Sequence, residues 1–110
     1  MFQIGATLLE ACVLSILSDG DTYGYILTQN AREIINVAES TLYPVLRRLQ
    51  KSGDLTMYDM PYEGRLRRYY KITDKGLETL KTYRKEWLVY RAKVNRMLMV
   101  TEGDNDNEKV

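Results

Sequence analysis

The sequence contains no histidine and only one cysteine, Cys12, among its 110 residues. Zinc sites need several cysteine or histidine ligands, and the usual nucleophile–base pairs of enzymes draw on the same residue types. A structural zinc site and an internal disulfide are therefore excluded, and we expect no metal, no cofactor and no catalytic residue. Because Cys12 lies in an apolar segment, we expect a buried small side chain rather than a redox thiol.

The sequence also lacks an apolar run close to the length that crosses a membrane, and it shows no signal-peptide pattern. We therefore expect a cytoplasmic protein. The chain is 45% hydrophobic and 28% charged, which is typical of a soluble globular domain. Its length predicts one domain with an appended helix, and association with a second copy is compatible with so small a core.

The net charge of +1 conceals an uneven distribution. Residues 39–72 carry seven bases against four acids, and residues 73–100 carry seven against three. The segments 1–38 and 101–110 each carry four acids and one base. Positive charge is thus concentrated in the middle of the chain and in its last predicted helix. Residues 101–110 are polar without periodicity, and we expect them to form a disordered acidic tail.

Apolar periodicity predicts three helices, over residues 7–17, 23–35 and 40–53. The first is apolar on nearly every side, so we expect it to be covered on more than one face. Asp21 or Thr22 is expected to cap the second helix and Ser40 the third, and Gly53 ends the third. Two strands follow, at 55–61 and 66–72, and Thr73 is expected to cap a last helix that runs to residue 100.

The predicted third helix has one apolar and one basic face. Its apolar arc consists of Leu42, Val45, Leu46 and Leu49. The opposite side centres on Ser40, Pro44, Arg47 and Lys51, flanked by Tyr43 and Arg48. Pro44 is placed in the first turn, where a missing N–H costs least. A second basic cluster follows in the hairpin, made of Arg65, Arg67 and Arg68 beside Gly64.

Three helices followed by a hairpin predict a winged helix-turn-helix: a mainly α fold with a small β-wing. We expect this DNA-binding domain over residues 1–72, and a dimerisation helix over 73–100. A solvated helix face would explain either basic cluster alone. The two clusters together indicate binding of duplex DNA, with the third helix in the major groove and the wing at a neighbouring groove.

The predicted DNA contacts differ in kind. Arg47 and Lys51 are placed to reach base edges or phosphates, because an arginine fork matches the two acceptors of guanine. Near the start of the helix we expect hydrogen bonds to phosphate oxygens from Ser40, Thr41 and Tyr43. Pro44 and Arg48 complete this face. Arg65 is the candidate for the minor groove at the wing tip, and of the next two arginines we expect Arg67, rather than Arg68, to face DNA.

The last predicted helix carries an apolar seam at a/d spacing, which consists of Leu80, Tyr83, Trp87, Tyr90, Val94 and Met97. A three-helix core cannot cover all of it, so we expect a homodimer that joins through this seam. Trp87 is either a plain packing anchor or part of an aromatic cleft at the dimer axis, where a planar ligand would stack between the Trp87 side chains of the two subunits. In the second case we expect the cleft to include Leu8, Cys12, Tyr83 and Tyr90.

Three motifs resemble those of the PadR family of bacterial transcriptional regulators, in the family's order and spacing over residues 5–98. They are Tyr23-Gly24-Tyr25, STLYPVLRRL at 40–49 and GRLRRYYKIT at 64–73. The single last helix is similar to that of the short, subfamily-2 members. The resemblance implies a homodimeric repressor that holds operator DNA with its third helix and wing. It also implies a planar hydrophobic effector, sensed beside Trp87 as in multidrug-sensing relatives. Ser40 and Leu66 stand where members often have glycine and proline.

Two alternatives remain open. A winged helix can serve protein–protein contact alone, in which case the basic face stays solvated and no duplex is bound. An enzyme would have to rely on Asp, Glu, Lys or Tyr, and no paired carboxylates suggest one.

Overall fold

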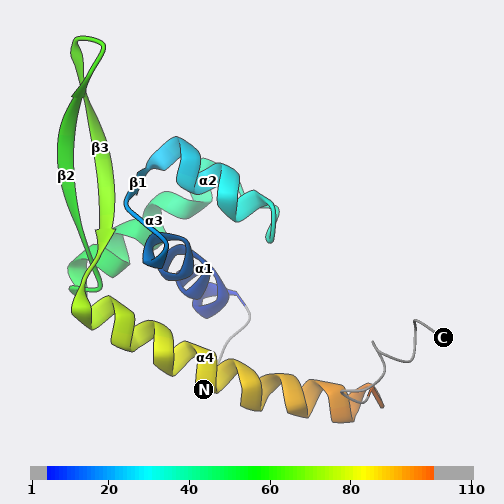
Figure 1. Cartoon of the computed structure of the whole chain (residues 1–110). Helices are drawn as coiled ribbons and strands as arrows, with labels where there is room; N and C mark the ends of the chain where they lie inside the picture. Colours follow the sequence, from blue (N-terminus) through cyan, green and yellow to red (C-terminus); the bar gives the residue numbers. More distant parts are fainter. Residues whose placement is uncertain (1–4, 101–110) are drawn as a thin grey trace.

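A computed structural model describes residues 5–100, so the predicted acidic tail at 101–110 lies outside the described residues. The elements are α1 (Ala6–Ser18), β1 (Thr22–Tyr23), α2 (Gly24–Arg32), α3 (Glu39–Lys51), β2 (Leu55–Tyr62), β3 (Arg65–Ile72) and α4 (Asp74–Met97). The first three helices form a body beside which the β2–β3 hairpin projects, and α4 starts at the base of the hairpin and runs below this body (Figure 1). The predicted mainly α, winged-helix architecture is confirmed.

The centre of the fold is α1, which contacts α2, α3, α4 and β3. Val13 and Leu14 on this helix have no exposed surface. The prediction that the first helix is covered on more than one face is therefore confirmed. Because elements of the same chain pack around α1, the apolar side chains on its several faces do not by themselves require a partner subunit.

The predicted caps of the second and third helices are wrong. Thr22 lies in β1, opposite Tyr70 of β3, so the chain is extended where a cap was expected and α2 begins only after Tyr23. The third helix begins at Glu39, one residue before Ser40, and its N-cap is Ala38. As a result Pro44 lies in the second turn, where its ring removes the N–H that would bond to the carbonyl of Ser40.

The predicted cap of the last helix is confirmed, since Oγ1 of Thr73 accepts a hydrogen bond of 3.0 Å from the backbone N–H of Gly76. The 24 residues of α4 span about 36 Å at 1.5 Å per residue. Its first half packs on α1, and its second half extends past the body (Figure 1). None of the helices in residues 5–100 is both long enough and apolar enough to span a membrane.

The wing is a regular antiparallel hairpin in a sheet of order β1-β3-β2. Its register runs from Leu55 opposite Ile72 to Tyr62 opposite Arg65. The turn between the strands consists of Glu63 and Gly64, with φ of 50° and 77°. Positive φ at both positions is the two-residue turn whose twist suits a hairpin. The short β1 pairs only with the base of β3, so the outer part of the wing is two-stranded.

Candidate nucleic-acid interface

The amphipathic character of α3 is present in the structure. Its buried face consists of Leu42, Val45, Leu46 and Leu49, each at most 4% exposed. The residues expected to face DNA are exposed on the other side, and they are Ser40, Thr41, Tyr43, Pro44, Arg47, Arg48 and Lys51. A helix anchored by four buried side chains presents its polar face in a fixed orientation, as groove recognition requires.

The start of α3 differs from a simple phosphate site. The hydroxyl of Tyr43 donates a 3.1 Å hydrogen bond to Oε2 of Glu39, the first residue of the helix. Partial burial and this neighbouring carboxylate raise the pKa of Tyr43. The hydroxyl of Tyr43 is thus engaged within its own helix, although its side chain is exposed, and the exposed Ser40 and Thr41 lie at the same end.

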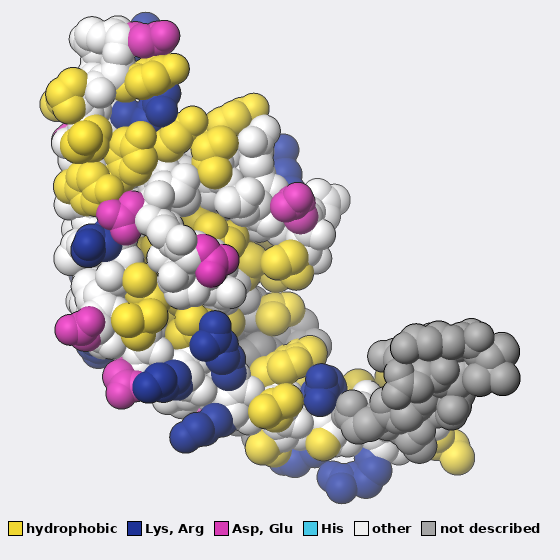
Figure 2. Space-filling view, viewed as in Figure 1, with side chains coloured by type: hydrophobic (Ala, Val, Ile, Leu, Met, Phe, Trp, Pro, Cys, Tyr) yellow, Lys and Arg dark blue, Asp and Glu magenta, His cyan; other side chains and the backbone are white. Residues whose placement is uncertain are grey.

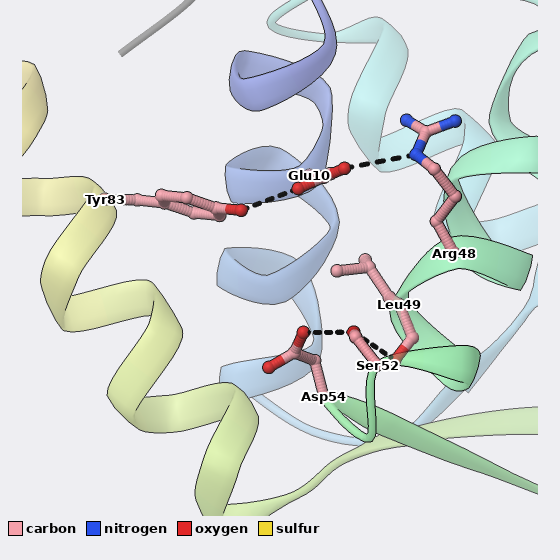
Figure 3. Close-up of polar contacts among 6 residues, drawn as sticks. All are labelled: Glu10, Arg48, Leu49, Ser52, Asp54 and Tyr83. Atoms are coloured by element: carbon pink, nitrogen blue, oxygen red, sulfur yellow. Dashed lines mark hydrogen bonds and ion pairs between the residues drawn. The ribbon is translucent and has the colours of Figure 1, made fainter. Parts of the chain in front are cut away.

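Arg48 is turned toward α1, unlike a free groove-facing arginine. Its Nε lies 3.2 Å from Oε2 of Glu10 in α1. The other oxygen of Glu10 accepts a 2.6 Å hydrogen bond from the hydroxyl of Tyr83 in α4 (Figure 3). Burial and the bond to Glu10 raise the pKa of Tyr83. The three side chains join α3, α1 and α4, and the sequence offered no signal for this link beyond an acid in an apolar helix.

A second polar cluster that sequence reasoning missed surrounds Asp54, which is 5% exposed. Its Oδ1 accepts a 2.6 Å hydrogen bond from the hydroxyl of Thr79. Its Oδ2 accepts one from the hydroxyl of Ser52 (Figure 3). Its backbone carbonyl accepts from the N–H of Thr73 at 3.0 Å. Asp54 therefore ties the end of α3 to the start of α4. The sequence does contain an indication of this cluster, because Asp54 directly follows the helix-ending Gly53 and precedes an apolar strand.

The three wing arginines have different surroundings. Arg65 is exposed beside the turn. The Cζ of Arg67 lies 4.0 Å from the ring centroid of Tyr23 and 3.4 Å from that of Tyr62. The Nε of Arg68 lies 3.2 Å from Oδ1 of Asp59. Of the three, Arg65 is therefore the cation presented at the tip of the wing.

Four of the five predicted ligand-binding residues line one cavity between α1 and α4. The cavity has a volume of about 250 Å³, and the four are Leu8, Cys12, Tyr83 and Trp87. Burial raises the pKa of the Cys12 thiol, which favours the neutral thiol expected of a packing residue. Tyr90 does not line this cavity, although its ring centroid lies 6.0 Å from that of Trp87.

The predicted dimer seam divides into two parts. Leu80 is 3% exposed and belongs to the core of its own chain, so it is not available to a partner. Farther along α4, a groove of about 550 Å³ is lined by Val89, Tyr90, Val94 and Met97 together with Lys85, Glu86 and Lys93. Met97 is 71% exposed there. In residues 5–100 no three His, Cys, Asp or Glu side chains are grouped as a metal site.

Comparison with known proteins agrees with this geometry. The profile described as "Transcriptional regulator PadR-like family" matches residues 13–82. The transcriptional regulator Rv3488 of Mycobacterium tuberculosis is 36% identical over 80 residues, covering 72% of this chain and 73% of that protein. The crystal structure of smu.1704 from Streptococcus mutans UA159 has a TM-score of 0.79 at 39% identity, covering 89% of this chain and 92% of that one. A PadR-like regulator from Bacillus cereus has a TM-score of 0.74 at 35% identity, covering 86% and 94%.

Proposed function

The chain belongs to the PadR-like family of transcriptional regulators, and from this premise we propose that it is a homodimeric, sequence-specific repressor. Members of this family are DNA-binding regulators of transcription, not enzymes. The observation that carries the proposal is the pairing of an anchored, exposed basic face on α3 with an exposed arginine at the tip of the wing. A groove-filling helix beside a wing that reaches the next groove is suited to duplex DNA.

In this proposal α3 lies in the major groove with Arg47 and Lys51 toward the base edges. Ser40 and Thr41 donate to phosphate oxygens at the start of the helix, flanked by Tyr43 and Pro44. Arg65 enters the adjacent minor groove or contacts its phosphates. Arg48 supplies positive charge at the edge of the interface while paired with Glu10.

The dimer is proposed to form through the second half of α4, around Trp87, Tyr90, Val94 and Met97. This surface supports dimerisation because it is apolar and extends beyond the body that could cover it. Two copies then present their α3 helices to half-sites about one DNA turn, ~34 Å, apart. Occupation of promoter DNA by such a dimer would block transcription.

DNA binding is tested by fluorescence anisotropy across a salt series, with a duplex selected from a random library by the wild-type protein. Affinity is expected to fall steeply with salt, and the slope of log affinity against log salt should become shallower by about two in Arg65→Ala, which loses one phosphate contact in each subunit. Arg47→Ala should weaken binding to the selected duplex, because it removes a contact with the base edges. Lys81→Ala is the matched control, because Lys81 is an exposed cation on α4 paired with Glu78. A dimer with no affinity for any duplex would instead favour the protein–protein module.

We further propose that a planar hydrophobic molecule relieves repression by entering the α1–α4 cavity beside Trp87. Its lining by Leu8, Cys12, Tyr83 and Trp87 supports this, since such ligands bind by stacking and apolar burial. Planar cationic dyes are expected to quench the emission of Trp87 and to weaken DNA binding in parallel. Emission that is unchanged up to high micromolar dye would contradict this part of the proposal.

A further inference from the structure

The wing carries a continuous row of stacked side chains on its outer face. Antiparallel partners point to the same side of a sheet, so Tyr58, Tyr69 and Tyr23 share this face with Arg67 and Tyr62. The rings of Tyr58 and Tyr69 are stacked with centroids 5.5 Å apart, and Tyr23 meets Tyr69 edge-on at 5.5 Å. Figure 2 shows hydrophobic side chains gathered along the hairpin.

Arg67 continues this row to the tip of the wing. Its guanidinium contacts the ring of Tyr23 in β1 and the ring of Tyr62, the last residue of β2. A planar guanidinium stacks on aromatic faces on both of its sides, which an ammonium group cannot do equally well. Arg67 thereby connects the short strand next to the body with the strand end that precedes the turn.

Most other side chains of the outer hairpin are exposed. Leu66 is 69% exposed, and Met60 and Tyr62 are each 48% exposed. Two-stranded hairpins without a core are marginally stable in water. At the base, the hydroxyl of Tyr58 donates a 2.7 Å hydrogen bond to Asp21, which fixes the lower part of the row to the body. The contacts of Arg67 extend this fixation toward the turn.

We propose that Arg67 is a positioning residue that orders the wing tip through the Tyr23–Arg67–Tyr62 stack and so presents Arg65 to DNA, without contacting DNA itself. This inference rests on the proposed function for its DNA consequence. It assigns Arg67 a role different from the groove contact expected from the sequence. The stack also joins two of the motifs that resemble the PadR family, since Tyr23 belongs to the first and Arg67 to the third.

The stack is tested first in the protein without DNA. Arg67→Ala and Tyr62→Leu are each expected to speed amide hydrogen exchange at residues 60–67 by about tenfold, because the cation–π contacts are lost. The amides of α1 should keep wild-type rates. Arg68→Ala is the matched control: it breaks only the exposed pair with Asp59 and should leave the tip unchanged. Unchanged tip exchange in Arg67→Ala would overturn the proposal, whether or not the protein binds DNA.

The role in binding is tested with the duplex selected by the wild-type protein. Arg67→Ala, the charge-retaining Arg67→Lys and the uncharged change Tyr62→Leu are all expected to weaken binding, Arg67→Ala by about tenfold. Because Arg67 acts through Arg65, the double variant Arg65→Ala/Arg67→Ala should bind no more weakly than Arg65→Ala alone.

Additive losses in the double variant would show that Arg67 contacts DNA directly. Wild-type affinity in Tyr62→Leu would show that binding does not need the stack. Either result would overturn the proposal. Failure to select any duplex would instead refute the proposed function. The exchange experiment would then still decide whether Arg67 orders the wing.

Discussion

The hydroxyl of Tyr83 in α4 and the carboxylate of Glu10 in α1 share a hydrogen bond with 2.6 Å between their oxygen atoms. Tyr83 also lines the cavity between these helices, and the second oxygen of Glu10 pairs with Arg48 of α3. Glu10 is therefore the point at which the long helix, the central helix and the basic helix are connected by polar contacts. A displacement of Tyr83 in the cavity would act on α3 through the hydrogen bond from Tyr83 to Glu10 and the ion pair between Glu10 and Arg48.

Replacement of Glu10 by glutamine tests the strength of this connection. Glu10→Gln removes the charge that pairs with Arg48 and replaces one of the two acceptor oxygens by an N–H2 group, so the charge-assisted hydrogen bonds are lost and the free energy of unfolding should fall by about 1–2 kcal/mol. Urea denaturation measures the change. The control is Glu78→Gln, whose exposed pair with Lys81 should contribute less than about 0.5 kcal/mol. Equal effects of the two changes would contradict a structural role for Glu10.

Tyr83 should make stability sensitive to alkaline pH. Its pKa is raised in the folded state by burial and by Glu10. The stabilisation by the neutral hydroxyl is therefore fully present below the unfolded pKa of about 10 and is lost as the pH rises further. Urea denaturation between about pH 8 and pH 11 should show a steeper decline in the wild type than in Tyr83→Phe. The exposed Tyr25→Phe serves as control, and parallel curves for wild type and Tyr83→Phe would disprove the coupling.

Gly76 should be intolerant of any side chain. A Cβ at this position would overlap the backbone carbonyl oxygen of Asp54 and lie 2.7 Å from Cγ1 of Ile72. Because a backbone atom cannot move aside cheaply, Gly76→Ala should lower the free energy of unfolding by about 2–3 kcal/mol, measured by thermal and urea denaturation. Gly5→Ala is the matched control, since its Cβ would meet nothing within 4 Å and the change should stay within about 0.5 kcal/mol. Similar losses for both would indicate that the packing of α4 on Asp54 is looser than described.

The proposed dimer should depend on the exposed end of α4. Met97 is 71% exposed in the single chain, so Met97→Lys should leave the fold intact while burying a charge in the dimer interface. Sedimentation velocity is expected to show a dimer for the wild type and an increase of at least about tenfold in the dissociation constant for the variant. Thr82→Lys, at another exposed position on α4, should remain dimeric. A wild-type protein that sediments as a folded monomer would exclude the interface.

Patterns of local origin were predicted well from the sequence. The apolar arc of α3 is buried as the 3.6-residue period indicates, Gly53 follows the end of α3, and Thr73 caps α4. These features depend on residues within a turn or two of each other, so composition and spacing are sufficient. The predicted cap at Thr22 is wrong for the opposite reason: Thr22 pairs with Tyr70, a partner far along the chain, and this pairing overrides the local preference. The cap at Ser40 is wrong because the third helix begins at Glu39, so Ser40 lies inside it.

The amino-acid sequence by itself therefore determined the winged-helix class, the basic face of α3 and the family to which the chain belongs. Only the tertiary structure decided the surroundings of each charged side chain. The sequence places Arg47, Arg48, Arg65 and Arg67 all among the expected DNA contacts. They differ once folding places Glu10 beside Arg48 and two tyrosine rings around Arg67, while Arg47 and Arg65 stay exposed. The physical reason is that partners separated by tens of residues set the environment of a charge, and periodicity along the chain carries no information about them.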